Sequence, residues 1–239
     1  MIQSTLFCVL NISVTRLLTP INDKFTGNER INALTFEELS NNFAFRINSE
    51  AKVNTFEEFL EFNSNLNPSL KLMIEIKATK DVDSLVKILI EMFKKYQLFD
   101  VAVVASFNPI ILYKLRKFDP KIVSLLLVKD DLFYFLFHES TSLPTMFENL
   151  PNSLKSFIKV NSKIIDFIYF NTLIYVVPSF VGAGVLGIYH DIFDKYPNLM
   201  NDLERRGYGM VAWTVNEHKK KEKLMKMNKK LSILTDHLF

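Results

Sequence analysis

Two oppositely charged side chains at the end of one short apolar run offer the most direct chemistry in this sequence. Residues 72–77 (LMIEIK) are rich in apolar and β-branched types, which is typical of a buried strand. Because side chains alternate along a strand, Glu75 and Lys77 share one face and the isoleucines take the other. At the carboxyl end of a parallel strand, a carboxylate can bind a hard cation and a lysine can hold a phosphate oxygen. An ordinary strand-end ion pair is the alternative, and the motif alone does not separate the two.

Two other motifs resemble known sites but fit them poorly. Residues 182–187 (GAGVLG) satisfy the dinucleotide-binding pattern G-x-G-x-x-G, but Pro178 and three more residues separate them from the run 173–177 (LIYVV). That pattern needs its glycines directly after the strand, with an acidic residue about 20 positions further on. We interpret it as a glycine-rich apolar loop or the approach to a helix. The adjacent His190 and Asp191 could act as a base and its orienting group, but one such pair is weak evidence, and we interpret them as the start of a surface helix.

The composition bounds the class of protein. The 239 residues are 49% hydrophobic and 23% charged, which excludes wholesale disorder. A net charge of +3 does not require nucleic acid as a partner, and the single cysteine, Cys8, excludes an internal disulfide framework. The run 218–230 holds seven lysines. It predicts the solvated face of an amphipathic helix, with attraction to anionic lipid as the alternative.

The elements that must position these residues alternate between strands and helices. We predict a strand at the front, residues 7–14, and further strands at residues 72–77, 101–106, 122–128, 173–177, 210–215 and 231–235. We predict helices at residues 82–96, 110–117 and 199–206, and at two capping boxes that begin with Thr35 and Thr55. This order predicts an α/β protein with a parallel sheet, either doubly wound or a closed barrel. No linker divides the chain, so we predict a single domain over residues 1–239.

Targeting signals are weak. Residues 5–10 (TLFCVL) are apolar but lack a basic flank and a cleavage site, so we do not expect a signal peptide. The longest apolar region, residues 164–189, contains Asp166 and Pro178, so we do not expect a clean transmembrane helix. This region is either folded core or a surface that dips into lipid. The expected location is therefore membrane-associated or cytoplasmic.

A resemblance covers the chain from about residue 20 to its end. It is carried, in order, by residues 31–39 (INALTFEEL), 53–62 (VNTFEEFLEF), 72–77 (LMIEIK), 105–109 (ASFNP), 112–122 (LYKLRKFDPKI), 209–216 (GMVAWTVN) and 233–238 (ILTDHL). The chain thereby resembles the glycerophosphodiester phosphodiesterase family. The phenylalanine-rich stretch before the second-last segment is similar to the membrane-associated mammalian branch. The family fold is a (β/α)8 TIM barrel, which the resemblance implies here, incomplete at its first strands.

The resemblance also implies an activity and a site. The family hydrolyses glycerophosphodiesters or lysophospholipids to an alcohol and glycerol phosphate or a related phosphate. By resemblance Glu75 is a ligand of a divalent metal, Mg²⁺ or Ca²⁺, Lys77 is a catalytic residue beside the phosphate, and Trp213 binds substrate. The metal would act as a Lewis acid on the phosphoryl oxygen. The expected partners are this substrate and a membrane surface, without nucleic acid.

The sequence departs from the family pattern near its front. The family has a strand that ends in His-Arg-Gly, then Glu-x-Asp and then His-Asp, and none of these occurs in place here. The pair at His190 lies too far downstream to substitute for the last of them. A lone Glu75 is therefore expected to hold a divalent ion only weakly.

Three interpretations remain open from the sequence. The first is a phosphodiesterase whose front end is missing from this chain. The second is a catalytically inactive barrel that acts as a binding or interaction module. The third is an unrelated α/β protein whose motifs coincide by chance.

Overall fold

The computed structural model describes residues 7–12, 35, 37–38, 54–66, 71–77, 81–139, 147 and 149–236, with the backbone alone for residues 7–12. The contacts group the chain into two compact units, Met1–Val123 and Ser124–Phe239. Each unit is described by itself below, and the single domain remains a prediction.

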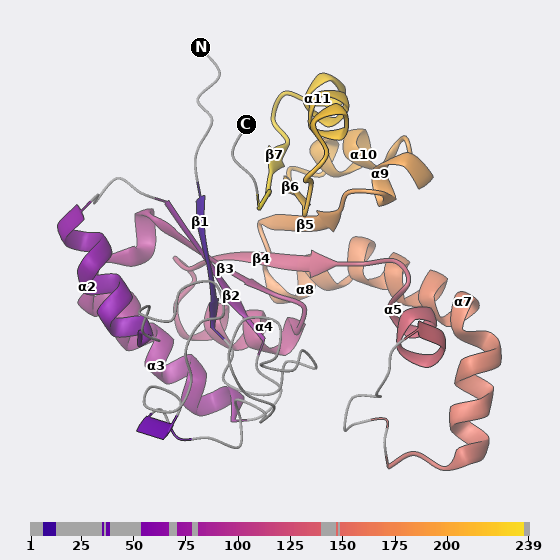
Figure 1. The fold of residues 1–239 in the computed structure, drawn as a ribbon, viewed down its shortest axis with the longest axis horizontal. Coiled ribbons are helices and arrows are strands. Elements are labelled where there is room, and N and C mark those ends of the chain that lie inside the picture. The colour runs from indigo at the N-terminus through magenta and orange to yellow at the C-terminus, as the bar shows by residue number, and fades with distance from the viewer. Residues whose placement is uncertain are drawn as a thin grey trace. The chain divides into compact units, whose positions relative to one another are not determined.

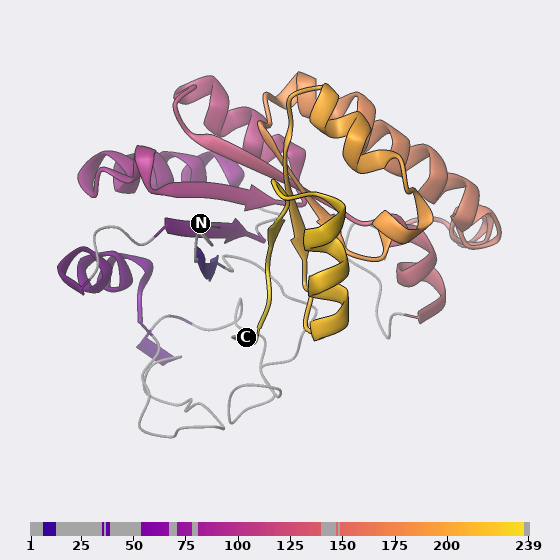
Figure 2. The same ribbon diagram turned by 90° about the horizontal axis from the view of Figure 1, so that it is seen from above.

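The first unit carries three parallel strands. They are β1 (Phe7–Ile12), β2 (Lys71–Ile76) and β3 (Ala102–Ser106), with β2 paired to both of the others. Its helices are α2 (Phe56–Leu66), α3 (Val82–Lys95), the short 3-10 helix η3 (Leu98–Asp100) and α4 (Pro109–Phe118). Strand and helix alternate along the chain, and Figure 2 shows α3 and α4 along the same side of the strands.

Local signals in the sequence explain where these helices begin. The Thr55 hydroxyl accepts the N–H of Glu58, and the Glu58 carboxylate accepts the N–H of Thr55 at 2.7 Å, so the predicted capping box is confirmed. Thr35 and Glu38 make the same reciprocal bonds. These carboxylates bond to backbone donors, which holds the pKa of Glu58 below its usual value.

The second unit carries four parallel strands. They are β4 (Val123–Val128), β5 (Val185–Tyr189), β6 (Gly209–Trp213) and β7 (Ser232–Ile233), each paired to the next. Its helical segments are α5 (Leu132–Tyr134), the π-helix η4 (Phe135–Glu139), α7 (Asn152–Tyr175), α8 (Val177–Val181), α9 (Ile192–Lys195), α10 (Leu199–Arg205) and α11 (His218–Met227). Parallel strands joined by helices in both units confirm an α/β protein, whereas a full (β/α)8 barrel is not confirmed.

One predicted strand is wrong. Residues 173–177 belong to the end of α7 and the start of α8, and the strand of this region is β5. Leu173 and Ile174 are buried, so the run satisfied the apolar criterion for a strand although it continues a helix. A short apolar run does not distinguish a buried helix from a buried strand. The strand β5 also takes residues 185–187 of the GAGVLG motif, so the interpretation of that half as a loop or helix approach is wrong. Gly187 lowered the apparent strand propensity of these residues.

Glycine at the end of α10 confirms another prediction. Gly207 has φ of 82°, the left-handed region, and its N–H donates to the Glu204 carbonyl at 2.9 Å. The next N–H, of Tyr208, donates to the Leu203 carbonyl at 3.1 Å. This glycine therefore ends the helix, because a residue with a Cβ is strained in that conformation.

The long helix α7 extends from the side of the second unit, with α5 against it (Figure 1). Asp166 of α7 is buried and accepts the backbone N–H groups of Phe133 and Tyr134 at 2.7 and 2.8 Å. This carboxylate therefore fixes the start of α5 to the middle of α7. Within the described part of the chain, no helix has both the length and the apolar character that crossing a membrane requires.

The last strand is tied back to the loop after β6. The Asn216 side chain donates to the Asp236 carboxylate and accepts the Asp236 N–H, both at 3.0 Å. The N–H of Leu234 donates to the Ala212 carbonyl, and the N–H of Val215 donates to the Leu234 carbonyl, both at 2.8 Å. We call these four bonds the Asn216 clasp.

Candidate functional site

The charged pair at the carboxyl end of β2 has the geometry that strand alternation predicts. The Lys77 Nζ lies 3.4 Å from Glu75 Oε1, and their side chains are 28% and 12% exposed. Ile74 and Ile76, on the other face, are completely or almost completely buried. The lysine therefore reaches solvent, while the carboxylate is mostly enclosed.

Register places specific neighbours beside Glu75. Asn11 of β1 and Ala105 of β3 are its partners on the two flanking strands. The buried Ser106, at the end of β3, donates to the Ile76 carbonyl at 2.8 Å. The ends of β2 and β3 are thus held together by a side-chain bond just beyond Glu75.

The family-like segment after β3 has a structural role. Asn108 precedes Pro109, and its side-chain oxygen accepts the N–H of Ile110 at 3.0 Å, which begins α4. The Asn108 N–H donates to the Ser106 hydroxyl at 3.1 Å. This segment therefore orders the turn after β3.

In the second unit, Trp213 ends β6 beside an aromatic partner. Tyr189 of β5 is its register partner, and their ring centroids are 5.4 Å apart. A Cβ placed on Gly187 would lie 2.7 Å from side-chain carbons of both Leu125 and Leu127, and 3.4 Å from the Trp213 ring. The last glycine of the GAGVLG motif thus provides space for packing in the sheet.

Lys129, directly after β4, joins this aromatic cluster. Its Nζ lies 4.8 Å from the ring centroid of Phe135, 5.5 Å from that of Tyr189, and 3.1 Å from Asp131 Oδ1. Sequence reasoning missed Lys129 and Tyr189. The available signal was a lysine at the end of the predicted strand 122–128. The Tyr189 signal was hidden because β5 was not recognised.

His190 and Asp191 follow β5 and have structural partners. The His190 Nδ1 lies 2.9 Å from Asp191 Oδ1, and Asp191 begins α9, as predicted. The same carboxylate oxygen accepts a bond from Lys220 of α11 at 2.9 Å, and Lys220 also pairs with Asp194. The bond from Lys220 holds the pKa of Asp191 below its usual value, against a smaller effect of burial. Asp191 is therefore committed to an ion-pair network between α9 and α11.

The described residues do not fit a resident divalent metal ion. Among them, no three histidine, cysteine or acidic side chains are grouped closely enough to hold a metal. Glu75 is a single carboxylate with an ammonium group 3.4 Å away, whereas Ca²⁺ takes six to eight oxygen ligands and Mg²⁺ six.

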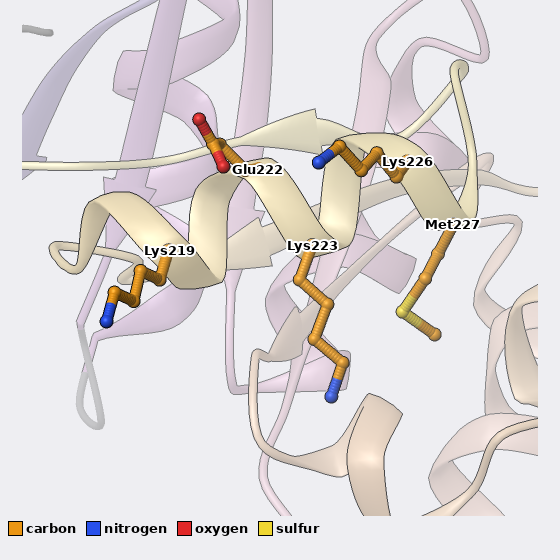
Figure 3. Close-up of a pocket in the computed structure, with 5 residues that line it drawn as sticks. All are labelled: Lys219, Glu222, Lys223, Lys226 and Met227. Atoms are coloured by element: carbon orange, nitrogen blue, oxygen red, sulfur yellow. The ribbon is translucent and has the colours of Figure 1, made fainter.

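The lysine-rich helix α11 borders a hollow on the surface (Figure 3). Lys219, Lys223 and Met227 project from one side of the helix there, and Glu222 and Lys226 from the other. These five lining residues include none of the predicted site residues. The helix has an exposed lysine-rich side and buries Leu224, as predicted for an amphipathic helix.

No protein-family model matches this sequence, and a search of curated proteins finds no match. Solved structures do match. A phosphodiesterase from Oleispira antarctica, in complex with its product sn-glycerol-3-phosphate, has a TM-score of 0.63 at 14% identity, over 96% of this chain and 81% of that one. A glycerophosphodiester phosphodiesterase from Parabacteroides distasonis has a TM-score of 0.60 at 16% identity, over 88% of this chain and 70% of that one.

A third match is a glycerophosphodiester phosphodiesterase from Agrobacterium tumefaciens, with a TM-score of 0.60 at 9% identity over 96% of this chain and 84% of that one. At such identities the likeness shows the fold alone. The family resemblance is therefore supported by the fold, and the mammalian branch remains a prediction.

Proposed function

We propose that this chain is a phosphoric diester hydrolase that cleaves glycerophosphodiesters or lysophospholipids to an alcohol and glycerol phosphate or a related phosphate. The observation that carries the proposal is a charged pair, Glu75 and Lys77, at the carboxyl end of a parallel strand. The likeness in fold to glycerophosphodiester phosphodiesterases, one of them with bound sn-glycerol-3-phosphate, supports it.

Lys77 is the proposed phosphate contact. Its ammonium group is partly exposed and lies 3.4 Å from one carboxylate oxygen, which is long for an ion pair with a direct hydrogen bond. An incoming phosphodiester can therefore bind Lys77 without breaking a short bond. Lys77 would neutralise charge that develops on the phosphoryl oxygens as the ester bond breaks.

Glu75 is the proposed ligand for Mg²⁺ or Ca²⁺. Because the described residues do not form a closed metal site, Glu75 would hold such an ion only weakly. Trp213 is the proposed substrate contact, through the aromatic surface that it forms with Tyr189.

Hydrolysis of glycerophosphocholine and lysophosphatidylcholine by the purified chain, with added Mg²⁺ or Ca²⁺, tests this proposal. Glu75→Ala should abolish the activity, and Lys77→Met should lower kcat/KM about a hundredfold or more. The matched control is Lys114→Met, which removes an exposed ion pair with Asp83 on two helices of the same unit. Full activity in Glu75→Ala would refute the metal assignment.

A catalytically inactive binding module is the second candidate. The chain has four histidines but no His-Arg-Gly or Glu-x-Asp segment, and the described residues contain no three-ligand metal cluster. In this case sn-glycerol-3-phosphate should bind to the purified chain in calorimetry, and Lys77→Met should weaken that binding. No hydrolysis should occur with either metal. Turnover by the purified chain would exclude this candidate.

A further inference from the structure

The carboxyl ends of β4, β5 and β6 bring a lysine and two aromatic rings to one edge of the sheet. Tyr189 ends β5, and its register partner Trp213 ends β6. Lys129 directly follows β4, one position beyond the register pair of Val128 and Ile188. The carboxyl ends of parallel strands are where α/β proteins bind their ligands. These three side chains therefore lie where a ligand is expected.

The lysine and the two rings also share one face of the sheet. A Cβ on Gly187 would lie 2.7 Å from a Leu127 side-chain carbon and 3.4 Å from the Trp213 ring, so these positions pack together. Side chains two positions apart share a face of a strand, which places Tyr189 on the face of Gly187. Lys129 stands in the same relation to Leu127, and its contact with the Tyr189 ring agrees with this placement. The three side chains thus lie together at the end of one packed face, within the second unit.

The ammonium group of Lys129 is surrounded by groups that attract cations. Its Nζ lies 4.8 Å from the ring centroid of Phe135 and 5.5 Å from that of Tyr189, which is within the range of a cation–π interaction. Asp131 Oδ1 lies 3.1 Å from the same nitrogen. Grouped aromatic faces recognise quaternary ammonium ligands, and a carboxylate adds Coulomb attraction. In this chain an internal lysine occupies the place of such a ligand.

We infer that Lys129 selects the head group of the substrate, because its ammonium group excludes choline from the aromatic surface and favours an uncharged polyol such as glycerol. The inference rests on the proposed function, in which Trp213 contacts the substrate. A quaternary ammonium group at the Tyr189 ring would meet the like charge of Lys129 at close range. A head-group hydroxyl can instead accept a hydrogen bond from Lys129, whose side chain is 27% exposed and has three N–H donors. Glycerophosphocholine then remains a substrate, but with a higher KM.

A purely structural cation–π contact is the alternative, and the same unit contains an example for comparison. The Lys163 Nζ lies 5.4 Å from the ring centroid of Tyr134, a contact between α7 and α5. Lys129 differs because it contacts two rings, and one of them belongs to Tyr189, which packs against Trp213 at the strand ends. A structural lysine affects stability alone, whereas a selective lysine changes which cations and head groups bind.

Titration of the purified full chain with tetramethylammonium chloride, followed by tryptophan fluorescence, tests the inference without any turnover. The sequence has one tryptophan, Trp213, so the signal reports on this site. The unmodified chain should bind the ion only weakly. Lys129→Met should bind it at least about tenfold more tightly, because the substitution frees the two ring faces and the Asp131 carboxylate. Sodium chloride at the same concentrations accounts for the effect of ionic strength.

Calorimetry with glycerophosphoglycerol and glycerophosphocholine measures the head-group preference itself. The unmodified chain should bind glycerophosphoglycerol more tightly, and Lys129→Met should reverse this order. Lys129→Arg keeps a cation in place and should keep the original preference. The matched control is Lys163→Met, which removes a cation–π contact of similar length and should change neither measurement. Thermal unfolding followed by circular dichroism establishes that each variant folds.

The inference is overturned if Lys129→Met binds tetramethylammonium no more tightly than the unmodified chain, or if Lys129→Arg gains the same binding. It is also overturned if the unmodified chain and Lys129→Met rank the two glycerophosphodiesters in the same order. Failure of the proposed function is a separate result: both compounds would bind in the expected order, and neither would be hydrolysed.

Discussion

The strand ends of the two units differ in how firmly their charged side chains are held. After β2, the Lys77 Nζ and the Glu75 Oε1 are 3.4 Å apart, which is long for a direct hydrogen bond. After β5, Asp191 is bonded to Lys220 at 2.9 Å, and Lys220 also binds Asp194. A charge that is already bonded to a fixed partner stabilises the fold but is costly to redirect to a ligand. The comparison therefore supports Glu75 and Lys77 after β2 as the proposed site and assigns the charges after β5 to the stability of the fold.

The largest expected effect tests this division directly. Glu75→Ala should abolish hydrolysis of glycerophosphocholine, whereas His190→Gln should change kcat/KM less than about threefold, because the partner of His190, Asp191, is committed to Lys220. Steady-state kinetics on the two purified variants measures the contrast. A large loss in His190→Gln, with Glu75→Ala still active, would reverse the assignment.

The close packing between β4 and β5 predicts the next effect, on stability. Gly187→Ala should lower the free energy of unfolding by about 1–3 kcal/mol, because its Cβ would lie 2.7 Å from Leu125 and Leu127 side-chain carbons. Gly184→Ala is the matched control, since a Cβ there meets nothing within 4 Å. Urea unfolding of both variants measures the difference. Equal stabilities would show that the leucines move aside at little cost.

Asp166 provides a buried carboxylate whose role is structural, for comparison with Glu75. Asp166→Asn replaces one of two acceptor oxygens with a donor, so it should cost about 1–3 kcal/mol of unfolding free energy. Burial raises the pKa of Asp166, although the two backbone bonds oppose this effect.

The pH dependence of the Asp166 effect has a definite sign. Because the pKa of Asp166 is higher in the folded chain than in the unfolded chain, its contribution to stability is fully present at pH values below the unfolded pKa, about 3.8. The contribution is lost as the pH rises through the pKa of the folded chain. The cost of Asp166→Asn should therefore be largest in acid and smaller at neutral pH. Urea titrations at several pH values measure it, and a cost that grows toward neutral pH would contradict the buried-carboxylate account.

The smallest effect concerns the network after β5. Lys220 donates hydrogen bonds to both Asp191 and Asp194, and these bonds lower the pKa of each carboxyl group. Carboxyl groups whose pKa is lowered on folding contribute stability above about pH 3.8, and this stability is lost as the pH falls through the pKa of the folded chain. Lys220→Gln should thus cost about 1 kcal/mol or less at neutral pH, because the carboxylates are 48% and 40% exposed and solvent screens them.

Acid unfolding should show the same linkage. The Lys220→Gln variant should lose less stability than the unmodified chain between neutral pH and pH 3, since the largest cause of the lowered pKa of Asp191 and of Asp194 is removed. The bond from Lys223 to Asp194 remains, so the difference should be partial. Lys114→Gln, which removes a pair on another unit, is the control. If stability falls with pH in the same way for all three proteins, the ion pairs of Lys220 do not contribute to stability.

The sequence predicted what depends on local periodicity and missed what depends on packing. Alternation along β2 correctly placed Glu75 and Lys77 on one face, because side-chain direction in a strand is fixed by its neighbours. The capping boxes were predicted for the same reason. The strand β5 was missed because it contains a glycine. Gly187 leaves room for the side chains of Leu125, Leu127 and Trp213, and a packing requirement of this kind cannot be read from local sequence. Lys129 joins Tyr189 only through that missed strand.

The Asn216 clasp joins Leu234 and Asp236 to the residues on either side of Trp213. Removing Asp236 deletes two of its four bonds, and ending the chain before Leu234 deletes all of them. The loop directly after Trp213 would then lose its restraint from β7, although no residue near the tryptophan had changed. Shortening the chain from its carboxyl end is therefore a way to loosen a candidate substrate contact from a distance, and any fusion partner attached there should leave Asp236 in place.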